Sequence, residues 1–240
     1  MKTLTKLIAI LVLLLTTTSC FIDGMTGIRG NGNIISEDRT ISNDFDEIKV
    51  QQGINLFLTQ GNSVALNVEA DENILDLLIT EVKNNELKVY FEKNVYRAKA
   101  RNVYLTTKNI SKIRTSSGAS VKSENTLQVS TLDLDSSSGS AIKVYINAEE
   151  VTSNCSSGAH IKIYGNAHTL SAKASSGSSI DADELKTVDA FATASSGANV
   201  NVNVTNKLTA RASSGGDIDY EGEPRNIDKD TSSGGSVSGS

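Results

Sequence analysis

The sequence predicts an all-β chain wound into a β-solenoid with two main faces, and three observations lead to this prediction. Serine is concentrated in one part of the chain, because 27 of the 31 Ser follow residue 110 in a chain of 240 residues. The tripeptide Ser-Ser-Gly recurs seven times in that part, at intervals of 18 to 21 residues. Apolar and polar residues alternate on both sides of each tripeptide, which is typical of a strand with one buried face.

The overall composition excludes several other classes of protein. Hydrophobic residues make up 38% of the chain and Gly another 18 of 240 residues, which together come to about 45% and argue against disorder. A single Pro excludes a proline-rich linker or a collagen-like chain. The net charge of −5 argues against a nucleic-acid-binding protein, since such proteins carry a basic surface. The length fits one large β domain or two small ones.

The first residues of the chain predict export and a lipid anchor. Lys2 and Lys6 precede a nine-residue apolar stretch at 7–15, which is too short to cross a bilayer. Small residues then lead to Cys20, an arrangement that resembles a bacterial lipoprotein signal, although Thr17 stands where Leu is usual. We expect a signal peptide at 1–19, a lipid on Cys20 and a linker at 20–29. The alternative is an ordinary secretory signal with an incidental cysteine.

The Ser-Ser-Gly repeat predicts a turn followed by a strand in every coil. We expect turn-defining glycines at these corners, because Gly adopts backbone conformations that other residues resist; they are Gly118, Gly139, Gly158, Gly177, Gly197, Gly215 and Gly234. A β-branched apolar residue lies three positions after each Gly. We expect these residues to stack into a core ladder, which comprises Val121, Ile142, Ile161, Ile180, Val200 and Ile218, with Val237 in the last partial coil.

A second strand precedes each corner, and its residues three positions before the Gly are all small. Cys155 falls in this register, so we expect it to be a small buried side chain rather than a nucleophile. Each repeat therefore comprises a strand, a turn, a second strand and a second turn in about 19 residues. A single repeat cannot bury its own apolar face. Stacking the coils at about 4.8 Å buries that face and pairs each strand with the next coil. Lys229 interrupts the apolar pattern of the last coil, beyond Pro224.

The N-terminal half carries a less regular form of the repeat. The segments 45–56 and 110–121 share their apolar positions and their corner, which makes Gly53 a further turn-defining residue and Leu56 a further member of the core ladder. Gly32 lies one repeat length earlier, so we expect the winding to begin near residue 30. We therefore predict a single solenoid domain at 30–240, with an irregular head at 30–110 and regular repeats at 111–240. Within the head, 64–69 and 86–92 alternate like strands, and 71–82 has the pattern of a short helix.

These motifs resemble those of a known family, the head GIN domain family of putative auto-transporter adhesins. The resemblance rests on the Gly53-Ile54-Asn55 strand, the Thr59-Gln60-Gly61 turn, the segment at 70–73 and the recurrent Ser-Ser-Gly, and it covers about residues 40–225. It implies a right-handed β-helix with two sheets, of the kind carried by exported proteins of Bacteroidetes-type bacteria. Catalytic residues are not implied by this resemblance.

We find no motif in the sequence that defines an active site. His160 and His168 lie eight residues apart with no third metal-ligating residue nearby, so a solvated surface is the favoured interpretation. The Gly-rich segment at 29–33 lacks the remaining features of a phosphate-binding loop. Surface carboxylates are the one enzymatic alternative, because β-helices that cleave polysaccharides use such groups; they are Asp181, Asp183, Asp217 and Asp219. Lys122, Lys143 and Lys162 fall in the register of Asp181.

We therefore expect a cell-envelope lipoprotein, on the surface or the periplasmic face of the outer membrane, whose solenoid binds a glycan or protein ligand in cell adhesion. Its expected partners are the membrane, through the lipid on Cys20, and that ligand, while nucleic acid is excluded and a homo-oligomer is left open. We expect no catalytic residue, no metal and no cofactor. The alternatives are a polysaccharide-processing enzyme that uses surface carboxylates and a purely structural or envelope-signalling protein.

Overall fold

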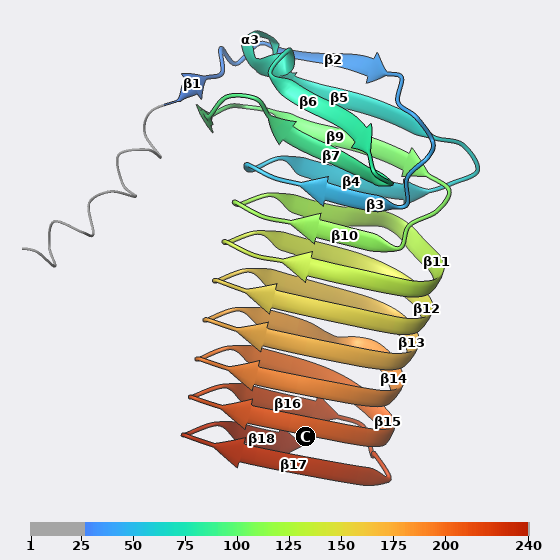
Figure 1. Cartoon of the computed structure of the whole chain (residues 1–240), viewed down its shortest axis with the longest axis vertical. Helices are drawn as coiled ribbons and strands as arrows, with labels where there is room; N and C mark the ends of the chain where they lie inside the picture. The colour runs from blue at the N-terminus through green and yellow to red at the C-terminus, as the bar shows by residue number, and fades with distance from the viewer. Residues whose placement is uncertain (1–26, 240) are drawn as a thin grey trace, which may run out of the picture.

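The computed structural model describes residues 27–239 as a β-solenoid, which confirms the predicted fold class. Figure 1 shows coils stacked into a column, with an irregular head at the N-terminal end and the last strands at the opposite end. The predicted signal peptide at 1–19 and the predicted lipid anchor at Cys20 lie outside the described residues.

Five long strands form the regular part of the column, and each runs from one Ser-Ser-Gly corner to the next. They are β11 (Ser120–Ser136), β12 (Ala141–Ser156), β13 (His160–Ser175), β14 (Ser179–Ser195) and β15 (Asn199–Ser213). Each continues around the far bend of its coil, where we expected a separate turn. The parallel pairing shifts register beside this bend, for example between Lys122 and Thr126. The far bend therefore absorbs the differences in repeat length, while the corners stay aligned.

At each corner the chain reverses in a two-residue β-turn. In the first corner Ser117 has φ 54° and Gly118 has φ 73°, and the backbone N–H of Ala119 donates to the carbonyl of Ser116 at 3.2 Å. Both central residues of such a turn need positive φ. The N–H of Gly118 also donates to the carbonyl of Ser138 in the next coil, at 3.1 Å. The serine before each glycine thus shares the left-handed conformation, which the sequence analysis assigned to glycine alone.

The core lies between the two faces of the column and consists of stacked apolar side chains. The residues named as the core ladder are at most 1% exposed; they are Leu56, Val121, Ile142, Ile161, Ile180, Val200 and Ile218. The column nearest the corners is filled by small side chains such as Ala174, Ala194 and Cys155, which is 3% exposed. The core therefore tapers toward the Ser-Ser-Gly edge.

Two more coils continue the parallel stack into the head. The strands β3 (Glu47–Val50) and β4 (Asn55–Gln60) flank a corner at Gln52 and Gly53, both of which have positive φ. The strand β10 (Lys112–Thr115) joins this coil to β11, and the strands β7 (Glu86–Phe91) and β9 (Arg101–Thr107) form the coil above it.

The head ends in antiparallel strands that cover the last parallel coil. The strand β5 (Ala65–Asp71) pairs antiparallel with β9, and β2 (Ile34–Arg39) pairs antiparallel with β5. The short β1 (Ile28–Arg29) pairs with β8 (Val95–Arg97). The expectation that the winding begins near residue 30 was wrong, because residues 34–39 belong to this antiparallel cover and the parallel coils begin at β3.

The predicted helix at 71–82 is only one turn long. The structure has α3 (Glu72–Leu75), followed by the strand β6 (Leu78–Lys83), which pairs antiparallel with β7. The hairpin turn between them is Asn84-Asn85, and both of these residues have positive φ. Pairing with β7 satisfies the backbone of 78–83 at the edge of the sheet, so tertiary structure overrides the helical pattern. The two successive Asn residues were the signal for this turn that we missed.

Asp71 holds the Gly-rich segment of the head in place. The residue is 1% exposed, and its carboxylate accepts hydrogen bonds from the backbone N–H groups of Gly32 at 2.8 Å and of Lys99 and Ala100 at 2.9 Å. A Cβ on Gly30 would lie 2.1 Å from a carboxylate oxygen of Asp71, which is closer than atoms can approach. These contacts fix the position of the Gly-rich segment in the head.

The opposite end of the column consists of β16 (Asp217–Glu221), β17 (Asn226–Ser232) and β18 (Ser236–Gly239). Tyr220 and Lys229 occupy inward positions in register with Val202 and Ala210 of the preceding coil. The Lys229 ammonium lies 4.5 Å from the centre of the Tyr220 ring and 3.0 Å from its hydroxyl. An inward charge is one way in which proteins discourage pairing at a sheet edge.

Candidate functional site

Of the carboxylates singled out from the sequence, Asp183 and Asp219 line one small hollow of about 230 Å³ together with Asn201 and Glu221. Asp181 and Asp219 belong to the same outward column with Asn201 between them, which places them about 10 Å apart. Asp181 accepts hydrogen bonds from Asn201 at 3.0 Å and from Ser179 at 3.1 Å. His160 lies 3.6 Å from Asp181. Within residues 27–239 there is no group of three or more His, Cys, Asp or Glu placed to hold a metal ion.

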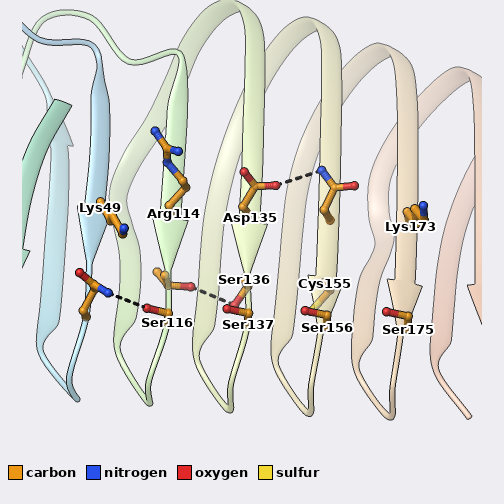
Figure 2. A pocket seen from close by; sticks show the side chains of 13 residues that line it. Lys49, Arg114, Ser116, Asp135, Ser136, Ser137, Cys155, Ser156, Lys173 and Ser175 are labelled. Atoms are coloured by element: carbon orange, nitrogen blue, oxygen red, sulfur yellow. Dashed lines mark hydrogen bonds between the residues drawn. The ribbon is translucent and has the colours of Figure 1, made fainter. Parts of the chain in front are cut away.

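A groove of about 440 Å³ runs along the Ser-Ser-Gly edge on the face formed by the strands that lead into the corners. We call it the corner groove. It crosses β3, β10 and the ends of β11, β12 and β13, and Figure 2 shows its side chains projecting in rows from successive coils. Its lining residues are Lys49, Gln51, Arg114, Thr115, Ser116, Asp135, Ser136, Ser137, Asn154, Cys155, Ser156, Lys173 and Ser175.

One row of the corner groove carries charged and amide side chains, one from each coil. Arg114 pairs with Glu47 and, at 2.6 Å, with Glu86. Asp135 accepts from the Asn154 amide at 3.0 Å and pairs with Lys112 at 3.2 Å. These pairs neutralise most of the charge in the row.

The cations at the two ends of this row are not paired. In the part of the chain that the structure describes, Lys49 and Lys173 have no carboxylate within ion-pair distance. The groove therefore combines a nearly neutral middle with a cation at each end.

The second row consists of the first serine of each corner, and Figure 2 shows Ser116, Ser137, Ser156 and Ser175 in line. These serines are half-buried, and successive coils place them about 4.8 Å apart. Hydroxyl groups both donate and accept, so the row offers repeated hydrogen-bonding positions to a bound molecule.

The floor of the corner groove is made of small buried groups. The hydroxyls of Thr115, Ser136 and Ser140 form a triangle with 2.9 Å between each pair of oxygens. Burial raises the pKa of the Cys155 thiol, and the bonds from Ser178 and nearby backbone only partly oppose this effect. The raised pKa keeps the thiol protonated at neutral pH, and Cys155 is the small buried side chain that its register predicted. The hydroxyl triangle was not foreseen, although Thr115, Ser136 and Ser140 all stand at positions of small residues.

An extended solenoid with rows of polar side chains along a shallow groove defines a repeat protein of the kind that presents a long binding surface. The chain belongs to the family described as "putative auto-transporter adhesin, head GIN domain", whose model matches residues 44–224. This match confirms the resemblance stated from the sequence. A search of curated proteins gives no match.

Solved structures from Bacteroides and Parabacteroides species share the fold. A putative adhesin from Bacteroides fragilis superimposes with a TM-score of 0.83 and 20% identity, over 89% of this chain and 100% of that one. A putative lipid-binding protein from Parabacteroides distasonis superimposes with a TM-score of 0.71 and 21% identity, over 89% of this chain and 99% of that one. A putative adhesin from Parabacteroides merdae superimposes with a TM-score of 0.70 and 19% identity, over 89% of this chain and 98% of that one. At these identities the similarity establishes the fold.

Proposed function

We propose that the protein is an exported, lipid-anchored envelope protein whose solenoid binds a glycan or protein ligand in adhesion. The observation that carries this proposal is the corner groove, in which donors and acceptors recur with every coil. Membership of an adhesin family supports it. Since most charges in the middle of the groove are already paired, a hydroxyl-rich ligand such as a glycan fits its rows of serine and amide groups better than a highly charged one.

Polysaccharide cleavage is the second candidate function, and the geometry favours it less. A retaining glycosidase needs two carboxyl groups about 5 Å apart and an inverting one about 6.5–9.5 Å apart. Asp181 and Asp219 are about 10 Å apart, at the upper limit of the inverting range, and Asn201 stands between them. Asp181 is also held by two hydrogen bonds. A purely structural or envelope-signalling role is the third alternative, and it predicts that deletion alters the envelope without altering attachment.

Binding is tested with the purified protein on an array of host, matrix and bacterial-surface glycans and proteins. We expect binding, and we expect the pair of changes Asn154→Ala and Lys173→Gln to weaken it about tenfold, as for central residues of an interface. The matched control is Lys186→Gln, which removes an exposed lysine near the far bend and should leave binding unchanged. Failure to bind any of these surfaces would contradict the proposal.

Anchoring is tested separately with Cys20→Ala. A lipid on Cys20 would hold the chain at a membrane, and no helix in residues 27–239 is long and apolar enough to cross one. We expect the Cys20→Ala protein to appear in the soluble fraction and the wild type in the membrane fraction. Unchanged membrane association of Cys20→Ala would rule out the lipid anchor.

A further inference from the structure

The face opposite the corner groove carries exposed aromatic side chains in stacked pairs. The rings of Tyr145 and Tyr164, on β12 and β13, lie 4.6 Å apart at 16°. Nearer the head, Tyr104 and Phe57 lie 5.0 Å apart at 15°. Tyr145 is 38% exposed and Tyr104 is 42% exposed. Exposed aromatic groups that cluster on a polar surface mark interaction sites, and flat rings offer a surface on which the C–H face of a sugar can pack.

Three lysines stand beside these rings in adjacent coils. Lys122, Lys143 and Lys162 pair residue for residue along the ladder. Like charges placed directly opposite one another cost stability, so this column is not explained by packing.

Carboxylates neutralise only the outer two lysines of the column. Lys122 pairs with Glu124 at 2.9 Å, and Lys162 pairs with Glu184 at 3.3 Å. Lys143, in the middle, has no carboxylate partner among residues 27–239, and its ammonium lies 5.2 Å from the centre of the Tyr164 ring. The column therefore presents one unneutralised cation flanked by aromatic rings.

The same column continues toward the head through aromatic residues. Lys122 pairs with Phe57, and Phe57 pairs with Tyr104 in the coil above. Four steps of about 4.8 Å separate the coil of Tyr104 from the coil of Lys162, which gives a length of about 19 Å. This length exceeds that of a single sugar and matches a short stretch of a linear polymer. At the other end the column changes sign, because Asp181 follows Lys162.

We propose that this tyrosine–lysine strip, formed by Tyr104, Lys122, Lys143, Tyr145, Lys162 and Tyr164, binds a linear polysaccharide that carries carboxylate groups. The sugar rings pack on the tyrosines, and the ammonium of Lys143 pairs with a carboxylate of the polymer. A nucleic acid is the less suitable polyanion, because the chain has a net charge of −5 and the acidic residues next to the strip repel a uniformly charged backbone. The inference rests on the proposed binding function and names a ligand class for a second face of the same module.

The test is calorimetric titration of the purified protein with hyaluronan and polygalacturonate, beside neutral dextran and a single-stranded DNA oligonucleotide. We expect binding to the two carboxylated polymers, weakening as salt is added, and no binding to dextran. Tyr145→Ala should weaken binding about tenfold and Lys143→Gln about fivefold, the losses expected of central contacts. Tyr145→Phe should retain the affinity, because the ring and its stacking remain.

Lys83→Gln is the matched control, because it removes an exposed lysine of β6 in the head that belongs neither to the tyrosine–lysine strip nor to the corner groove. It should leave affinity for the carboxylated polymers unchanged. The inference is overturned if neither polymer binds, if Tyr145→Ala leaves the affinity unchanged, or if the DNA oligonucleotide binds as tightly as hyaluronan. A protein that binds an array ligand only through the corner groove would overturn this inference and leave the proposed function intact.

Discussion

Asp71 shows how one side chain fixes the head of the solenoid. Burial alone would raise the pKa of its carboxyl group. The hydrogen bonds that the carboxylate accepts from three backbone N–H groups have the larger combined effect, so the pKa is lowered from 3.8. A carboxyl group with a lowered folded-state pKa contributes stability above its ordinary pKa, and this contribution is lost as the pH falls through the folded value. The ionised form of Asp71 therefore stabilises the fold at neutral pH.

Asp71→Asn is expected to lower the free energy of unfolding by about 1–3 kcal/mol at pH 7, because an amide oxygen accepts these bonds less strongly and its NH₂ faces donors. The difference in free energy of unfolding between the wild type and Asp71→Asn should shrink as the pH falls below 3.8 toward the lowered pKa of the folded state. Denaturant unfolding as a function of pH measures it. The exposed Asp76 supplies the control, Asp76→Asn, which should change little. A deficit that is the same at every pH would contradict the role of the charge.

Substitutions at two neighbouring residues of a corner turn should change the stability of the fold in opposite directions. Ser157 and Gly158 have φ of 56° and 69°, and a Cβ on Gly158 would meet no atom within 4 Å. Gly158→Ala should therefore destabilise the fold through backbone strain alone, by about 1–2 kcal/mol, while Ser157→Gly relieves the same strain. Thermal unfolding should show a lower Tm for Gly158→Ala and a higher one for Ser157→Gly. Equal losses in both variants would mean that the serine hydroxyl is needed.

Among the elements, the regular strands were predictable because every repeat has the same pattern of small and apolar residues around Ser-Ser-Gly. The corners, the core ladder and the parallel stacking follow from the spacing of Ser-Ser-Gly. The head was predicted only in part, since α3 and β6 share apolar positions that suit a helix, and only pairing with β7 decides between the two structures. The corner groove could not be located from sequence alone, because it depends on which outward side chains neutralise one another across coils.

The last strands also give a prediction at this scale. Lys229 points inward at the open end of the column, where its ammonium lies over Tyr220. Lys229→Ile would replace an inward charge by an apolar side chain and leave a continuous apolar end, which favours contact between chains. We expect concentration-dependent self-association in sedimentation velocity. Lys186→Ile is the control, since it adds the same side chain near the far bend. Association of both variants to the same degree would show that self-association does not depend on the open end of the column.

At the scale of the whole molecule, the solenoid separates stability from binding. Inward side chains and corner turns hold the coils together, which leaves the outward positions of both faces free to vary. One face carries the corner groove and the other carries the tyrosine–lysine strip, and both run along the stacking direction. This arrangement suits a long ligand that contacts several coils at once. It also places Asp181 and Asp219 two coils apart with Asn201 between them, and we expect binding without cleavage.

Binding without cleavage is tested most directly by the molar mass of a polysaccharide after incubation with the protein. Hyaluronan, polygalacturonate and any glycan found on the array would be incubated with wild-type protein and analysed by size-exclusion chromatography with light scattering. We predict that bound polymers keep their full length. Shortened polymers, with the shortening abolished by Asp181→Asn or Asp219→Asn, would contradict it and establish an enzyme.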